Sequence, residues 1–206
     1  MNSPGDPAAT RIDLLRHGEP AGGERYRGSL DDPLSETGWQ QMRQAIIGHP
    51  PWTRIVTSPL RRCREFAYEI ALDLGIDVQV EERFREMSFG LWEGRTSAQI
   101  MATEAEHLAN FWRDPLNYPP PEGEHLSQFR FRVEDAWNDL VGVTGHRHVL
   151  VVAHGGVIRV ILGVVLVMPM EHVSRLVVPY ACITRIVADR VAGQPLPRLV
   201  SHSATF

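Results

Sequence analysis

The chain has 206 residues, of which 43% are hydrophobic and 22% charged, a composition typical of a soluble globular domain with one sizeable core. Its formal net charge of −4 argues against a nucleic-acid-binding protein, because such proteins usually carry an excess of basic residues. There is no lysine, and all 21 side-chain cations other than histidine are arginines. Any anion site must therefore be built from guanidinium or imidazole groups.

The first ten residues indicate where the domain begins, and the two cysteines indicate the compartment. Residues 1–10 are polar and contain no apolar segment, so we expect a frayed tail followed by a single domain over residues 11–206. Cys63 and Cys182 follow no metal-ligand spacing, and unpaired thiols favour a reducing compartment, so we expect a cytoplasmic protein. The most apolar stretch, residues 157–168, is too short to span a bilayer and predicts a buried helix.

The first half of the chain alternates short apolar runs with amphipathic segments. Strands are predicted at residues 12–15, 55–57 and 78–80, with a Gly-, Asp- and Arg-rich loop over residues 21–33. Ser35 is a suitable N-cap for a helix to about residue 48. Ser58, followed by a proline at the first helical position, predicts the start of a helix that ends near residue 74.

The second half continues the alternation. Residues 81–95 predict a functional loop, helices are predicted over residues 97–112 and 127–141, and the apolar run 149–153 predicts a central strand. From about residue 174 the pattern indicates further strands. Strands that alternate with helices predict an α/β fold with a largely parallel sheet.

Two histidines occupy equivalent places, each at the end of a predicted strand and each followed by glycine. His17 follows the first strand and His154 follows the run 149–153. In open α/β sheets, ligands bind at the carboxyl ends of the strands. Glycine lets the backbone approach a bound group, and the helix predicted to begin near Gly155 would aim free N–H groups into the same crevice.

Three arginines at the start of a predicted helix add to this pattern. Arg61, Arg62 and Arg64 lie in the first turns of the helix predicted to begin after Ser58. Cations at a helix N-terminus oppose the helix dipole by about 0.3–1 kcal/mol each when exposed. An anion bound there would turn the repulsion into attraction, so we expect a phosphate site. The alternative is ordinary: clustered arginines are usually a solvated face, and a single Arg-His-Gly is often a surface turn.

Four segments resemble the histidine phosphatase (phosphoglycerate mutase-like) superfamily. They are LLRHGE at 14–19, TSPLRR at 57–62, FGLWEG at 89–94 and VVAHGG at 151–156. This resemblance covers nearly the whole chain and implies a three-layer α/β/α sandwich with a largely parallel central sheet. Within the superfamily, residues 27–32 (RGSLDD), 119–124 and 178–182 (VPYAC) are similar to the α-ribazole phosphatases of cobalamin assembly.

The resemblance implies a covalent mechanism. His17 would attack phosphorus and form a phosphohistidine that water hydrolyses, and its other ring nitrogen should donate to a backbone carbonyl. Arg16, Arg62, His154 and Gly155 would bind the phosphate oxygens, with His154 also counted as catalytic. No metal and no cofactor are implied, so we expect activity in EDTA.

The leaving alkoxide needs a proton, and the resemblance implies Glu86 as the general acid. The other place that holds an acid in some members, directly after the second histidine, carries glycine here. Burial against Phe89 or Trp92 would have to raise the pKa of Glu86. The alternative is a loop carboxylate paired with Arg83 or Arg85. We expect two other acids, at positions 19 and 93, to hold backbone or arginines in place.

Candidate substrate-binding residues are assigned in two regions. The segment between residues 16 and 28 looks shortened relative to the family, with Pro20 and Gly23 where many members carry Thr and Asn. For this reason Arg25 or Arg27 is a candidate for a further phosphate or substrate contact, and the choice between them stays open.

Near the proline-rich loop, Phe111, Trp112 and Tyr118 could form an aromatic wall for a flat base. The ordinary alternative is that they are core residues. His125 belongs to the same loop and is a further candidate substrate contact.

The favoured function is hydrolysis of α-ribazole 5′-phosphate, with a small-molecule phosphomonoester as partner and neither nucleic acid nor membrane. One alternative is a broader sugar-phosphate or phosphoglycerate phosphatase or mutase, although the absence of the long mutase insertions favours hydrolysis. A second alternative is a non-catalytic scaffold that binds a phosphoprotein. A homodimer is compatible with the sequence.

Overall fold

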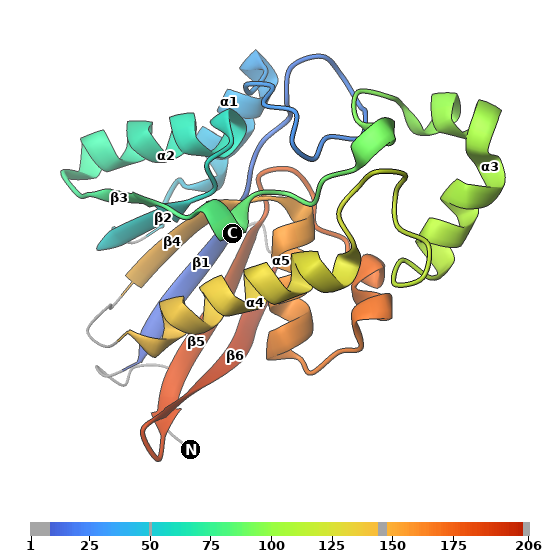
Figure 1. Cartoon of the computed structure of the whole chain (residues 1–206). Coiled ribbons are helices and arrows are strands. Elements are labelled where there is room, and N and C mark those ends of the chain that lie inside the picture. The colour runs from blue at the N-terminus through green and yellow to red at the C-terminus, as the bar shows by residue number, and fades with distance from the viewer. Residues whose placement is uncertain (1–8, 50, 144–147, 204–206) are drawn as a thin grey trace.

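The computed structural model describes residues 9–49, 51–143 and 148–203. The described residues form one six-stranded sheet with the strand order β3-β2-β4-β1-β5-β6 (Figure 1). Its strands are β1 (Thr10–Arg16), β2 (Arg54–Thr57), β3 (Val78–Val80), β4 (His148–Ala153), β5 (Ile183–Val191) and β6 (Gln194–His202).

The sheet is largely parallel, as predicted. Strand β4 pairs in parallel with β1 and with β2, and β2 pairs in parallel with β3. The two strands at the C-terminal end of the chain are antiparallel, β5 to β1 and β6 to β5. Residues 1–8 of the predicted tail lie outside the described residues, and Thr10 already belongs to β1.

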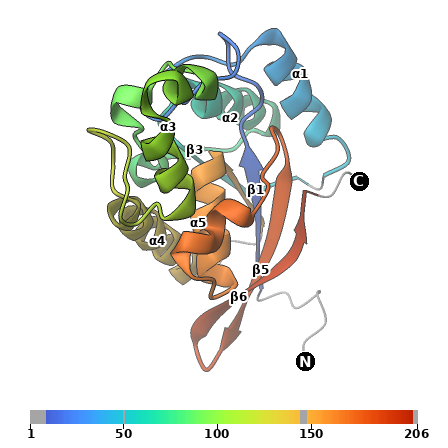
Figure 2. The same ribbon diagram turned by 90° about the vertical axis from the view of Figure 1, so that its right-hand side faces the viewer.

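Helices cover both faces of the sheet. They are α1 (Glu36–Ala45), α2 (Arg61–Leu74), α3 (Ser97–Arg113), α4 (Leu126–Gly142) and α5 (Gly155–Val165), with short 3₁₀ helices η1 (Glu82–Phe84), η2 (Gly90–Trp92) and η3 (Met170–Arg175). Figure 2 shows α1 on one side of the sheet and α4 and α5 on the other.

Strand β4 explains the three layers, because its side chains alternate between two cores. Val149 and Val151 pack in one hydrophobic cluster with residues of α4 and α5, whereas Leu150 and Val152 pack in a second cluster with residues of α1 and α2. Burial on both faces accounts for the continuous apolar run seen in the sequence. The α/β/α sandwich is thus confirmed.

Two predicted helix boundaries were wrong. Helix α2 begins at Arg61 rather than after Ser58, with Leu60 at the N-cap position and no side-chain cap. The physical reason is that Ser58 still pairs with the sheet: its N–H donates to the carbonyl of Val152 at 3.0 Å. Helix α1 ends at Ala45, before the expected residue 48.

Residues 157–168 contribute most of α5, and none of the described helices is long and apolar enough to cross a membrane. Cys63 and Cys182 are both buried and free.

Candidate active site

The two motif histidines meet because their strands are parallel neighbours. Arg16 at the end of β1 is in register with Ala153 at the end of β4, so His17 and His154 leave the sheet side by side. Their ring centroids are 5.2 Å apart in an edge-to-face arrangement, and both residues are buried. The expected meeting of these two histidines at the carboxyl ends of the strands is confirmed.

The imidazole of His17 is held in the form that a nucleophile needs. Its Nδ1 lies 2.7 Å from the carbonyl oxygen of Gly18, and a carbonyl can only accept, so Nδ1 carries the proton and Nε2 keeps its lone pair. Burial, together with the guanidinium groups of Arg62 and Arg16, holds the pKa of His17 well below its usual value. The predicted contact to a backbone carbonyl is present.

Two guanidinium groups flank the histidines and are fixed by backbone carbonyls. Arg16 donates through Nη1 to Val178 at 2.5 Å. Arg62 donates to the carbonyls of Leu30 at 2.6 Å and Gly28 at 3.0 Å. Among the described residues, the Nε atoms of both arginines are buried without a hydrogen-bond partner. Buried unpaired donors are costly, and an anion would satisfy them.

Helix α5 contributes its N-terminus to the same place. It begins at Gly155, and a Cβ built there would lie 3.4 Å from Nε of Arg16 and 3.4 Å from Nη1 of Arg159. Arg16, Arg159 and the N-terminus of α5 therefore converge on one point, where the guanidinium groups and the positive end of the helix dipole favour an anion.

Arg159 and Tyr180 were not predicted as site residues. Both line a cavity of about 620 Å³ together with Arg16, His17 and Glu86. Tyr180 lies under Arg16, whose Cζ is 4.1 Å from the ring centroid. The only signal in the sequence for Arg159 was its position as the charged interruption of the apolar stretch 157–168.

Glu86 lies at the edge of this cavity and is fixed by two backbone N–H groups. Its Oε2 accepts from Gly156 at 3.0 Å and its Oε1 from Met87 at 3.0 Å. The alternative of an ion pair with Arg83 is wrong, because Arg83 pairs with the carboxylates of Glu81, directly before η1, and of Asp135 and Asp139 in α4.

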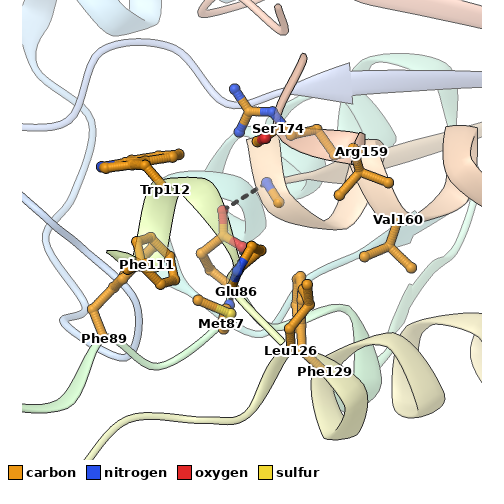
Figure 3. Close-up of a pocket in the computed structure, with 13 residues that line it drawn as sticks. Glu86, Met87, Phe89, Phe111, Trp112, Leu126, Phe129, Arg159, Val160 and Ser174 are labelled. Carbon is orange, nitrogen blue, oxygen red and sulfur yellow. Dashed lines mark hydrogen bonds between the residues drawn. The ribbon is translucent and has the colours of Figure 1, made fainter. Parts of the chain in front are cut away.

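A second, smaller and mostly apolar cavity of about 100 Å³ is also lined by Glu86 (Figure 3). Its apolar lining includes Met87, Phe89, Phe111, Trp112, Leu126, Phe129, Val160 and Val173. Four residues line both cavities: Glu86, Phe89, Trp112 and Arg159. The carboxylate of Glu86 therefore stands where the polar and the apolar cavity meet.

The candidate substrate residues divide into those that line the site and those that do not. Arg25 and Arg27 both line the larger cavity. Arg27 is buried and paired with Asp32 at 2.7 Å, whereas Arg25 is bonded only to the carbonyl of Gly22 among its described hydrogen bonds.

Tyr118 and His125, the candidates from the proline-rich loop, are exposed and line neither cavity. Phe111 is a core residue that also lines the smaller cavity, while Trp112 is half exposed at both cavities. Of the three residues of the predicted aromatic wall, Phe111 and Trp112 thus line a cavity of the site and Tyr118 does not.

The carboxylate of Glu93 ties the acid-bearing loop to the loop that holds Arg62. It accepts hydrogen bonds from the N–H groups of Ser29 at 2.8 Å, Leu30 at 2.9 Å and Phe89 at 3.1 Å. This agrees with the expectation that Glu93 holds backbone in place. The carboxylate of Glu19 instead accepts from the side-chain hydroxyl group of Ser35 at 2.9 Å. Within the described ranges, no three His, Cys, Asp or Glu side chains are grouped so as to hold a metal ion.

Comparisons with known proteins find similarity over most of the chain. The model of the histidine phosphatase superfamily (branch 1) matches residues 12–196. A glucosyl-3-phosphoglycerate phosphatase of Mycobacterium tuberculosis is 33% identical over 176 residues, 80% of this chain and 78% of that protein. The adenosylcobalamin/alpha-ribazole phosphatase of Salmonella typhimurium is 29% identical over 176 residues, 84% of this chain and 87% of that protein.

Among solved structures, a mycobacterial glucosyl-3-phosphoglycerate phosphatase superposes with a TM-score of 0.82 at 30% identity, and the match covers 96% of this chain and 100% of that one.

Proposed function

Since the chain belongs to the histidine phosphatase superfamily and is a phosphatase, we propose that His17 is its nucleophile. The Nε2 lone pair of His17 attacks phosphorus, the ester P–O bond breaks, and its electron pair leaves on the alcohol oxygen. Glu86 gives that oxygen its proton. Water then attacks the phosphohistidine, Glu86 takes the proton of the water, and the P–N bond returns its electron pair to Nε2.

Hydrogen-bond donors held in place by the fold would stabilise the negative charge that develops on the phosphoryl oxygens. Arg16 and Arg62 offer buried Nε–H groups that lack partners among the described residues, and the N-terminus of α5 adds backbone N–H groups at Gly155. His154 supplies a further donor at the same point. Such preorganised donors stabilise a transition state because they need no reorganisation during the reaction.

The position of Glu86 carries the proposal for the substrate. A general acid must lie next to the leaving oxygen, so the leaving alcohol extends from the phosphate cavity past Glu86 toward the apolar cavity. That cavity, lined by Phe89, Phe111 and Phe129, suits a flat apolar group. We therefore propose that the substrate is α-ribazole 5′-phosphate, whose base is flat and aromatic. Its hydrolysis to α-ribazole and phosphate would be a step of cobalamin biosynthesis.

A second candidate is a sugar-phosphate or phosphoglycerate phosphatase. It is favoured by the 33% identity to a glucosyl-3-phosphoglycerate phosphatase and by the arginines of the larger cavity, Arg25 and Arg159, beyond those that hold phosphate. The non-catalytic scaffold finds no support, because the chain is a phosphatase.

A substrate panel with one matched pair of variants tests the choice. Trp112 lines both cavities and Tyr118 lines neither, yet both side chains are about half exposed, so Trp112→Ala and Tyr118→Ala should both fold. We expect Trp112→Ala to raise KM for α-ribazole 5′-phosphate about tenfold, since stacking of a base on an aromatic ring contributes about 1–3 kcal/mol. Tyr118→Ala should leave it unchanged. Faster turnover of 3-phosphoglycerate or glucosyl-3-phosphoglycerate by the wild type would reject the α-ribazole assignment in favour of the second candidate.

A further inference from the structure

A buried hydroxyl group lies directly behind the second histidine of the site. Oγ of Ser58 is 2.6 Å from Nε2 of His154, and both residues are completely buried. The serine does not cap α2, so its side chain is free for this contact. It is held rigidly, because its N–H donates to the carbonyl of Val152 at 3.0 Å.

The direction of this hydrogen bond follows from the other partner of the hydroxyl group. The N–H of Leu60 points at Oγ of Ser58 at 3.3 Å, and an N–H can only donate. The hydroxyl proton needs an acceptor, because a buried unsatisfied donor costs about 1–3 kcal/mol. The hydroxyl group of Ser58 has two hydrogen-bond partners among the described residues, the backbone N–H of Leu60 and the imidazole of His154. Only the imidazole can accept, so the serine donates to Nε2.

The ring that accepts this proton is neutral. Burial and the cations Arg62 and Arg16 hold the pKa of His154 well below its usual value. The thiol of Cys63 lies 3.7 Å from Nε2 of the same ring, but burial raises its pKa and its sulfur lies 3.4 Å from the carbonyl of Ala153, so it stays protonated. A neutral imidazole with a lone pair at Nε2 carries its proton at Nδ1.

We infer that Ser58 is a positioning residue that fixes His154 as its Nδ1–H tautomer by donating to Nε2. In this tautomer Nδ1–H is the one ring donor left for the phosphoryl group. This inference rests on the proposed function, in which His154 binds phosphate. Without the serine, the ring proton of His154 can move from Nδ1 to Nε2. In the molecules in which it does so, the Nδ1–H donor to the phosphoryl oxygen is lost.

The test compares Ser58→Ala with a matched control, Thr57→Val. Thr57 is the neighbouring buried residue, and its hydroxyl group contacts the carbonyls of Ser58 and Val152 but not His154. The tautomer is read from imidazole ¹⁵N NMR shifts of protein labelled at histidine, with the His154 signals assigned by their absence in His154→Asn. No substrate is present in this measurement.

We expect a single Nδ1–H tautomer in the wild type and in Thr57→Val, and a mixture in Ser58→Ala. The kcat of Ser58→Ala should fall about 10- to 100-fold, somewhat less than the loss of a whole oxyanion donor, with a smaller change in KM. An Nε2–H tautomer in the wild type overturns the inference even if neither Ser58→Ala nor Thr57→Val folds. Equal losses of kcat in both variants with an unchanged tautomer also overturn it.

Failure of the proposed function gives a different result. If the proposed function is wrong, His17→Ala still turns over substrate. The tautomer of His154, which is measured without substrate, is not affected by that result.

Discussion

The carboxylate of Glu86 accepts a hydrogen bond from the backbone N–H of Gly156 at 3.0 Å, across 70 positions of sequence. Gly156 lies in the first turn of α5, which begins directly after His154. The first turn of α5 therefore both holds the carboxylate of Glu86, the proposed general acid, and supplies the backbone proposed to bind phosphate. A displacement of this turn would move both groups together.

The first prediction concerns the absence of a side chain at Gly156. A Cβ built there would lie 2.2 Å from Oε1 of Glu86 and 3.2 Å from the ring of Phe129, so the carboxylate would have to move. We expect Gly156→Ala to lower kcat for alkyl phosphates at least tenfold and for an activated aryl phosphate much less, because an aryl oxide leaves without help from an acid. The ratio of the two kcat values is the measurement.

Two further variants serve as a positive and a negative control for Gly156→Ala. Glu86→Gln should change the ratio in the same direction, since it removes the proton donor itself. Gly142→Ala, at the end of α4, places its Cβ in open space and should behave like the wild type. An unchanged ratio in both Gly156→Ala and Glu86→Gln would mean that Glu86 is not the acid.

The second prediction concerns the loop clamp formed by Glu93. Its carboxylate receives the N–H groups of Ser29 and Leu30, whose loop presents the carbonyls that orient Arg62. Glu93→Gln replaces one acceptor oxygen by a donor, which should lower the free energy of unfolding by about 1–3 kcal/mol. It should also weaken competitive inhibition by inorganic phosphate, because Arg62 is less well held.

Glu65→Gln is the matched control, since it removes the same charge from an exposed pair with Arg61 on α2. Such surface pairs contribute about 0–1 kcal/mol, so stability and phosphate inhibition should stay near the wild-type values. If Glu93→Gln is destabilised yet binds phosphate as the wild type does, the clamp supports the fold but does not position Arg62.

The third prediction is a dependence of stability on pH. Burial and nearby arginines hold the pKa of His17 and of His154 well below the ordinary value, near 6.5 in an unfolded chain. Above pH 6.5 both states are neutral at these rings. As the pH falls below 6.5, the unfolded chain binds protons that the folded chain does not, so the free energy of unfolding falls.

Denaturant unfolding between pH 7.5 and 5.5 measures this effect. Each such proton contributes a slope of up to about 1.4 kcal/mol per pH unit, and His17→Asn should reduce the slope by up to that amount. An identical slope in the wild type and His17→Asn would show that His17 is not buried in its neutral form.

Much of this site could be predicted from sequence because its parts are local. His17 and His154 each follow an apolar strand directly, and parallel strands bring their carboxyl ends to one edge of the sheet. The arginine-rich start of α2 had a local signal in its unfavourable charge. The same logic predicted the alternating strands and helices and the largely parallel sheet.

The sequence-based predictions that were wrong concern residues whose contacts are made with distant segments of the chain. Ser58 has the local signature of an N-cap, but pairing with Val152 keeps it in the sheet. Arg83 lies next to the acid-bearing loop in sequence, yet α4 supplies two of its carboxylate partners. Tyr118 is near Trp112 along the chain but lines neither cavity. No periodicity or spacing in the sequence encodes these tertiary preferences.

The covalent step is the central claim, and mass spectrometry of the intact protein tests it most directly. Wild-type protein and His17→Ala are mixed with α-ribazole 5′-phosphate, or with an activated aryl phosphate, and quenched rapidly without acid, which would hydrolyse a phosphohistidine. We predict a transient adduct of one phosphoryl group on the wild type, located at His17 by peptide mapping, and none on the variant. Steady turnover by His17→Ala, or an adduct on a different residue, would contradict the account.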